Sequence, residues 1–284
     1  MPRSNEFELD QIGPWSEIKL EILRKYAAAY SRILAAQTLH RLHHIYIDGF
    51  AGAGVHVSKS SGQFVAGSPT NALLVDPPFR EYHFIDLDGK KIAALEAISR
   101  EQNNVRIYHG DCSAILLERV LPLARYEEYK RALCILDPYG LHLDWRVIAE
   151  AGAMRSVEIF LNFPVADINR NVLRRRRDEA SSEQEARLTR FWGDDSWQGV
   201  AYRPSPQQSL WGNLPDEKTT NEELAAAFRQ RLKKVAGFEH VPEPLAMRNS
   251  QNAVLYYLYF ASHRPVAENI VRSIFNKYRK RGGN

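Results

Sequence analysis

Apolar residues in the first 164 positions recur with two different periods, which together predict alternating helices and strands. In residues 15–40 they stand three or four positions apart, the spacing of an amphipathic helix, with Ser16 as a plausible N-cap. Short continuous apolar runs follow and predict buried strands. These runs cover 43–48, 81–88, 104–111, 131–140 and 156–164, with helical stretches at 89–102, 112–124 and 143–153 between them. Buried strands that alternate with helices indicate an α/β fold with a doubly wound parallel sheet.

The alternation stops after Pro164. Helical stretches near 169–192 and 220–235 lie in a region that is rich in arginine, serine and tryptophan. Residues 244–263 then predict a strand, a turn at Ser250–Asn252 and a second strand, and a helix over 265–279 closes the chain.

The change in composition predicts three parts. They are an N-terminal helical segment (1–40), a Rossmann-like core (41–164 and 241–284) and a helical insertion suited to substrate recognition (165–240).

Polar residues stand where the predicted strands end. They are Asp48, Asp86, Asp88, Asp111, Asp137 and Asn162. Ligands of open parallel sheets bind at the carboxyl ends of the strands, so we expect a binding site at this edge. Aspartates in such positions also cap the following helix, and we favour capping for Asp88.

The glycine-spaced loop after the first strand limits which ligand could bind there. A dinucleotide site needs a third glycine, but Val55, His56 and Val57 follow Gly54. A phosphate-binding P-loop needs Lys-Ser or Lys-Thr after the last glycine, and none follows here. S-adenosylmethionine carries no phosphate and needs a turn that its methionine and ribose can approach closely. It also needs a carboxylate for the ribose hydroxyls, which Asp86 supplies.

Several stretches resemble class I S-adenosylmethionine-dependent methyltransferases, and more specifically the three-Cys-motif partner protein family. They are "WSEIK", "YIDGFAGAG", "GSPTNAL", "FIDLD", "LDPYG" and "LYYLYFASH". The resemblance implies a seven-stranded, mostly parallel Rossmann-like sheet with an antiparallel C-terminal hairpin, an N-terminal helix and a helical insertion. It also implies S-adenosylmethionine as cofactor and a three-Cys-motif protein as a partner.

The order of the motifs is also similar to that of ribosomal RNA adenine-N6 methyltransferases of the J type, which implies a set of cofactor-binding residues. They are Lys19, Phe50, Gly52, Ser68, Asp86, Asp111 and Cys112. The glycine turn and the strand ends add the remaining predicted cofactor-binding residues, which are Asp48, Gly49, Ala51, Gly54, Leu87 and Asp137. A solvated charge on the helix is the alternative for Lys19. The alternative for Gly67-Ser68-Pro69 is a helix-entry turn, with Ser68 as cap and Pro69 at the first helical position.

The "LDPYG" stretch resembles the D/N-P-P-Y/F motif of methyltransferases that act on amino groups of bases. The resemblance implies Asp137, Pro138 and Tyr139 as catalytic residues, with Asp137 accepting amino hydrogens and Tyr139 stacking on the base. The second proline is absent, and the motif also resembles that of transfer-RNA guanine-N2 dimethyltransferases. Adenine N6 and guanine N2 therefore both remain open as acceptors. Alternatively, Asp137 contacts cofactor or caps a helix, and Tyr139 packs in the wall.

Charge bears on the substrate. The chain of 284 residues carries a net charge of +4. Several arginines, among them Arg170, Arg174 and Arg187, lie near Phe191, Trp192 and Trp197. Basic and aromatic residues together suit RNA or DNA, so we expect Tyr139, Arg170 and Arg174 to bind substrate. A packed amphipathic hairpin with solvated arginines explains the same pattern. A small-molecule or protein substrate, and a catalytically weak partner subunit, also remain open.

The cysteines and the termini bear on location. There are two cysteines, Cys112 and Cys134, without metal-binding spacing. The N-terminus is polar, and no run approaches the roughly 20 apolar residues of a membrane span. These features predict a cytoplasmic protein with neither a metal nor a membrane partner.

Overall fold

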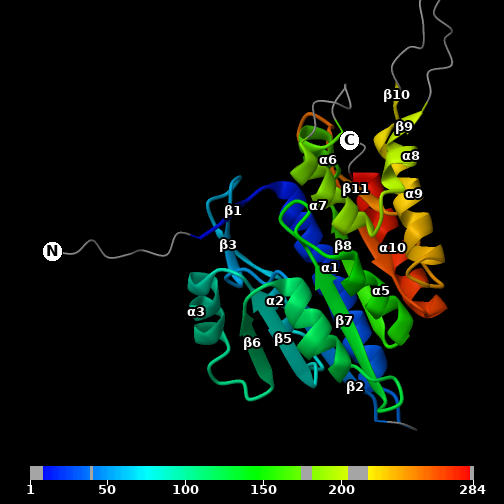
Figure 1. The fold of residues 1–284 in the computed structure, drawn as a ribbon. Helices are drawn as coiled ribbons and strands as arrows, with labels where there is room; N and C mark the ends of the chain where they lie inside the picture. Colours follow the sequence, from blue (N-terminus) through cyan, green and yellow to red (C-terminus); the bar gives the residue numbers. More distant parts are fainter. Residues whose placement is uncertain (1–8, 39–40, 174–180, 204–216, 282–284) are drawn as a thin grey trace, which may run out of the picture.

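The computed structural model describes residues 9–38, 41–173, 181–203 and 217–281, and its centre is a seven-stranded sheet (Figure 1). The strand order is β11-β12-β8-β7-β2-β5-β6. The strands in chain order are β2 (His43–Asp48), β5 (Glu81–Asp86), β6 (Val105–His109), β7 (Lys130–Leu136), β8 (Val157–Phe163), β11 (Leu245–Arg248) and β12 (Val254–Ala261).

Pairing within this sheet is parallel except at its C-terminal strands. β12 is antiparallel to both β8 and β11, while β2, β5, β6, β7 and β8 pair in parallel. The last strand of the chain therefore lies between the fifth and sixth strands of this sheet in chain order. This confirms the predicted Rossmann-like sheet with its antiparallel hairpin.

Helices cover both faces of the sheet. Alternate residues of β2 point to opposite faces, and Tyr46 belongs to one buried cluster while Ile45 and Ile47 belong to the other. The Tyr46 side is covered by α1 (Pro14–Ala35), α2 (Ser68–Leu73), α3 (Gly89–Ile98) and α10 (Pro265–Arg281). The other side is covered by α4 (Cys112–Ile115), the π-helical η1 (Leu116–Val120), the 3₁₀ turn η2 (Leu121–Leu123), α5 (Trp145–Met154) and the helices of the insertion. The fold is doubly wound, as predicted.

The segment between β8 and β11 packs onto the second face. Its elements are α6 (Val165–Asn171), α7 (Ser182–Trp192), α8 (Trp197–Ala201), β9 (Tyr202–Arg203), β10 (Glu217–Lys218) and α9 (Asn221–Lys234). Phe191, Trp192 and Trp197 are almost fully buried there, with the Phe228 ring 5.7 Å from that of Phe191. The hypothesis that these aromatics stack on bases is wrong, because their rings lie in the hydrophobic core between the insertion and the sheet.

Two local expectations differ from the structure. The N-cap of α1 is Gly13, with Pro14 at the first helical position, so Ser16 lies inside the first turn and is not the cap. Gly67 likewise precedes α2 as its N-cap, and Ser68 makes no side-chain capping bond.

A small sheet was not predicted. It consists of β1 (Gln11–Ile12), β3 (Val55–Ser58) and β4 (Phe64–Ala66), with β1 parallel and β4 antiparallel to β3. It ties the N-terminal segment to the residues that follow the glycine loop.

Among the residues described, none of the helices has both the length and the apolar character that crossing a membrane requires.

Candidate functional site

A cleft of about 590 Å³ lies at the carboxyl ends of β2, β7 and β8. The N-terminal segment, the glycine loop, the loop after β7 and α6 enclose it. The predicted site residues that line it are Lys19, Phe50, Ala51, Gly52, Ser68, Asp137, Pro138, Tyr139 and Arg170. Residues from five separate stretches of the sequence thus meet at the edge where a parallel sheet binds its ligands.

The other predicted residues lie below or beside the cleft. Gly49 and Gly54 are buried within the glycine loop, and Asp48 and Cys112 are buried beneath it. Asp86 is half-buried, Leu87 and Asp111 are exposed, and these three stand at the ends of neighbouring strands, outside the lining of the cleft. Arg174 lies outside the described residues.

The glycine loop has a fixed backbone. Gly52 and Gly54 have positive φ angles of 65° and 78°, a region that favours glycine. The Gly54 carbonyl accepts hydrogen bonds from the Gly67 amide at 2.7 Å and from the Thr70 hydroxyl at 2.6 Å. A Cβ at Gly54 would lie 2.5 Å from Ile98 Cδ1. The loop is therefore held against α2 and α3 while Gly52 stays open to the cleft.

Asp86 is oriented by this loop. Its Oδ2 accepts a hydrogen bond from the Gly52 amide at 2.8 Å, and its Oδ1 accepts one from the Asp88 amide at 2.9 Å. Each oxygen can still accept a further hydrogen bond. The next residue, Leu87, is 74% exposed although it is large and apolar. A polar acceptor and an apolar surface therefore stand side by side at the end of β5.

Helix capping, the alternative role for the strand-end acids, occurs at two of them. Asp88 accepts a hydrogen bond from the Lys90 amide at 2.8 Å and caps α3, the role favoured from its position. Asp111 accepts one from the Ala114 amide at 2.9 Å and caps α4. Its part in binding a cofactor stays a prediction.

A buried carboxylate lies below the loop. Asp48 is fully buried, and its Oδ1 accepts a hydrogen bond from the Phe50 amide at 3.3 Å. Its Oδ2 has no partner at hydrogen-bonding geometry among the described residues, although the Ser68 side chain lies close enough to lower the pKa of Asp48. Burial raises the pKa of Asp48 to about 7. Cys112 packs nearby, because a Cβ at Gly49 would lie 2.7 Å from its Sγ, and burial raises its pKa too.

An ion pair crosses the floor of the cleft. Lys19, from the first turns of α1, donates to Asp137 Oδ2, and Asn162 Nδ2 donates to Asp137 Oδ1 at 2.8 Å. Burial lowers the pKa of Lys19, but the charge and hydrogen bond of Asp137, together with Tyr256 and Asp48, outweigh burial, and the pKa lies above its ordinary value. Lys19 is therefore charged and holds Asp137 in place, and the alternative of a solvated helix charge is wrong.

Two further residues complete this floor. Asn162 Oδ1 is buried and has no hydrogen-bond partner among the described residues. The Tyr256 ring centroid lies 5.4 Å from Lys19 Nζ. The sequence placed Asn162 at a strand end without giving it a role and gave no sign of Tyr256. Tyr256 lies within the continuous apolar run that forms β12, so the sequence does not distinguish it from the core residues around it, although it lines the cleft.

The mouth of the cleft is formed by Tyr139 with two unpredicted residues. Tyr139 is 69% exposed, and Lys91 Nζ lies 5.3 Å from its ring centroid. Lys91 also pairs with Asp10 Oδ2 at 2.7 Å, to which the Tyr139 hydroxyl donates at 3.5 Å. Burial lowers the pKa of Lys91, but Asp10 and Tyr139 raise it, to about 12 overall. Because the three residues come from distant parts of the chain, no local pattern could have joined them.

Metal binding has no site in the part of the chain that the structure describes, since no group of three or more His, Cys, Asp or Glu side chains is arranged to hold an ion.

Comparison with known proteins gives likenesses of fold. No protein-family model and no curated sequence matches the chain. A Legionella pneumophila protein described by the family model DUF519 is 11% identical, with 90% of this chain and 91% of that one covered and a TM-score of 0.50. A putative methyltransferase from Thermobifida fusca is 15% identical, with 88% and 83% covered and a TM-score of 0.41. An S-adenosylmethionine-dependent methyltransferase from Clostridium acetobutylicum is 11% identical, with 86% and 91% covered and a TM-score of 0.40.

Of these three likenesses, the first shows a shared fold and nothing about activity. The two methyltransferases have TM-scores below 0.5, so their likeness to this chain is too slight to indicate its activity.

Proposed function

We propose that this chain is an S-adenosylmethionine-dependent methyltransferase that acts on an exocyclic amino nitrogen of a nucleic-acid base, adenine N6 or guanine N2. The observation that carries the proposal is the Lys19–Asp137–Asn162 cluster on the floor of the cleft. It presents an oriented carboxylate beside a glycine loop that is suited to a nucleoside.

The residues around the loop fit S-adenosylmethionine. Gly52 offers a close backbone approach, Asp86 has acceptor capacity for ribose hydroxyls, and exposed Leu87 offers an apolar surface to the adenine ring. Asp48 Oδ2 is a buried acceptor beneath them, without a partner at hydrogen-bonding geometry among the described residues. When bound, this cofactor supplies an electrophilic methyl group.

Asp137 is the residue that would orient the methyl acceptor. Lys19 and Asn162 each donate to one of its oxygens and fix the plane of the carboxylate, yet each oxygen can accept one more hydrogen bond. An amino group that donates to Asp137 and to a backbone carbonyl of the Asp137–Tyr139 loop has its nitrogen lone pair localised and aimed. The rate gain comes from this positioning.

A base is the acceptor that the mouth of the cleft favours. Tyr139 presents an exposed aromatic ring beside the reacting loop, and a flipped or single-stranded base can stack on such a ring. Arg170 lines the same cleft, is exposed and has no ion-pair partner among the described residues, so it is available for a phosphate.

A small-molecule amine is the second candidate acceptor. It is favoured by the burial of Phe191, Trp192 and Trp197, because these three rings of the insertion's described residues are then not available to stack on a long nucleic acid. Arg187 is also neutralised, by Glu183 at 2.7 Å.

A methyl-transfer assay tests the proposal. The protein is incubated with radiolabelled S-adenosylmethionine and with RNA, DNA or nucleic-acid-free cell extract, and labelled nucleosides are identified after digestion. We expect label in N6-methyladenosine or N2-methylguanosine, and a loss of about 100-fold in Asp137→Asn.

The matched control is Asp144→Asn, because Asp144 only caps α5 and pairs with Arg146. This variant should keep full activity. Label in the nucleic-acid-free extract alone would support the second candidate. No label anywhere, with S-adenosylmethionine bound, would leave a catalytically weak partner subunit, for which a three-Cys-motif protein is the expected partner.

A further inference from the structure

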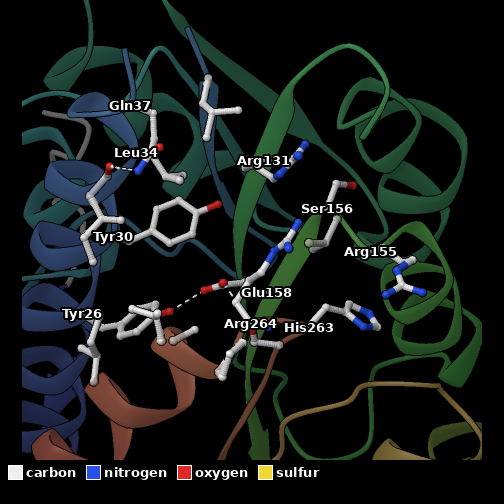
Figure 2. A pocket seen from close by; sticks show the side chains of 18 residues that line it. Tyr26, Tyr30, Leu34, Gln37, Arg131, Arg155, Ser156, Glu158, His263 and Arg264 are labelled. Atoms are coloured by element: carbon white, nitrogen blue, oxygen red, sulfur yellow. Dashed lines mark hydrogen bonds between the residues drawn. The ribbon is translucent and has the colours of Figure 1, made fainter. Parts of the chain in front are cut away.

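A second cavity, of about 360 Å³, opens at the opposite edge of the sheet, where β7 and β8 begin (Figure 2). We call it the basal pocket. It lies between α1, α10 and the starts of these two strands. Its lining is mixed: apolar side chains such as Leu34, Val266 and Ile270 face a group of polar ones that includes Arg131, Glu158 and Arg264. The methyl-transfer cleft lies at the other ends of the same strands, so the basal pocket plays no part in that chemistry.

Two arginines of the basal pocket lack a carboxylate. Arg131 lies with its guanidinium carbon 3.7 Å from the Tyr126 ring centroid, and Arg264 donates to the Tyr126 hydroxyl at 2.8 Å. Neither forms an ion pair with any residue that the structure describes. Because Arg264 lies close to Arg131, its charge adds to burial in lowering the pKa of Arg131. A pair of like charges held together in this way favours an anion between them.

The acid in the pocket forms no ion pair with either arginine within the described residues, although the charge of Arg264 acts against burial on its pKa. Glu158 is buried and accepts hydrogen bonds from the Tyr26 hydroxyl and, at 3.0 Å, from the Ser262 hydroxyl. Burial raises its pKa to about 7, so part of the population is uncharged at neutral pH. The balance of charge in the basal pocket is therefore positive.

An unused donor completes the site. Tyr30 is 6% exposed, and its hydroxyl has no hydrogen-bond partner among the described residues. In Figure 2 this hydroxyl points from α1 toward the strands, on the side of the pocket where Arg131 and Arg264 lie. A buried hydroxyl without a partner costs about 1–3 kcal/mol, and a ligand oxygen would remove that cost.

We propose that the basal pocket binds a small amphipathic anion, a molecule with a carboxylate or phosphate group on an apolar body. The oxyanion lies between Arg131 and Arg264 and accepts from the Tyr30 hydroxyl. The apolar body lies against Leu34, Val266 and Ile270. No residue of the methyl-transfer cleft takes part.

Calorimetry with four probes tests this. Octanoate and octyl phosphate each combine an anion with an apolar chain, octanol lacks the anion, and inorganic phosphate lacks the chain. We expect saturable binding of one molecule of octanoate or octyl phosphate per chain. Octanol and inorganic phosphate should bind with an affinity at least about tenfold lower. Whichever of octanoate and octyl phosphate binds more tightly shows whether the pocket prefers a carboxylate or a phosphate. Octanol binding as tightly as both anions, or no binding of either anion, would overturn the proposal.

Three variants locate the site. Arg264→Gln should weaken binding about tenfold or more, whereas Arg155→Gln, which removes an arginine of the same pocket already paired with Glu239 at 2.6 Å, should not. Tyr30→Phe should also weaken binding but leave the free protein equally or more stable, because it removes an unsatisfied hydroxyl. Unchanged affinity in both Arg264→Gln and Tyr30→Phe would place the probe elsewhere and sink the proposal.

Discussion

The Lys19–Asp137 ion pair predicts an unequal response when its two ends are removed. The side chain of Lys19 is 11% exposed and that of Asp137 is 32% exposed. Asp137→Ala leaves an ammonium group buried without its counter-charge, and we expect a loss of about 3 kcal/mol in the free energy of unfolding. Lys19→Met leaves the Asp137 carboxylate, which water can reach and to which Asn162 still donates a hydrogen bond. We therefore expect a loss of about 1 kcal/mol in the free energy of unfolding.

A double-mutant cycle measured by urea unfolding checks this. The double variant Lys19→Met/Asp137→Ala should lose much less than the sum of the two single variants, with a coupling of about 1.5 kcal/mol or more. The reasoning fails if Asp137→Ala is the milder single change. It also fails if the two losses simply add, because the two side chains would then not interact.

Further predictions concern the glycine loop and the buried acid of the basal pocket. Gly54→Ala should lower the free energy of unfolding in urea by about 2–5 kcal/mol, since it combines a φ of 78° with a clash against Ile98. Gly62→Ala, with a φ of 68° and open space around it, should lower it by about 1–2 kcal/mol. Equal losses would mean that packing at Ile98 is irrelevant. The pKa of Glu158 is raised by burial from an ordinary 4.5 to about 7, so the folded state holds the proton more tightly than the unfolded state. The stability contributed by this proton is present below pH 4.5 and is lost as the pH rises through 7. Glu158→Gln should make the stability profile flatter over this window, and an unchanged slope would show that Glu158 is not the group responsible.

The sheet could be predicted because its strands are continuous apolar runs. The predicted strand at 43–48 matches β2 to the residue, and the runs at 81–88 and 156–164 contain β5 and β8. Such a run is buried on both faces, so its signal does not depend on what packs against it. Ends of elements were less certain: α1 stops at Ala35, before the predicted residue 40.

The small sheet and the mouth of the cleft could not be predicted. Gln11 pairs with Val57, and Lys91 meets Asp10 and Tyr139, only after the chain has folded. Two-residue strands and surface charges leave no periodic pattern.

Interleaved arginines and aromatics misled for a related reason. Aromatic residues that face RNA have the same spacing as aromatic residues that face a core, and Trp192 and Trp197 are buried in the core. An acid at a strand end can either bind a ligand or cap the next helix, and the sequence does not distinguish the two roles. The hydrogen bonds do: Asp86 accepts from the glycine loop, whereas Asp88 caps α3.

This difference between Asp86 and Asp88 gives the most direct test of the proposed cofactor site. Asp86 faces the glycine loop through the Gly52 amide, whereas Asp88, two residues on, caps α3. Calorimetric titration with S-adenosylmethionine should show binding to the unchanged protein and a loss of about tenfold or more in Asp86→Ala. Asp88→Ala should keep its affinity while losing about 1 kcal/mol of stability. No binding to the unchanged protein, or equal loss of affinity in both variants, would contradict the assignment of the glycine loop and Asp86 to the cofactor.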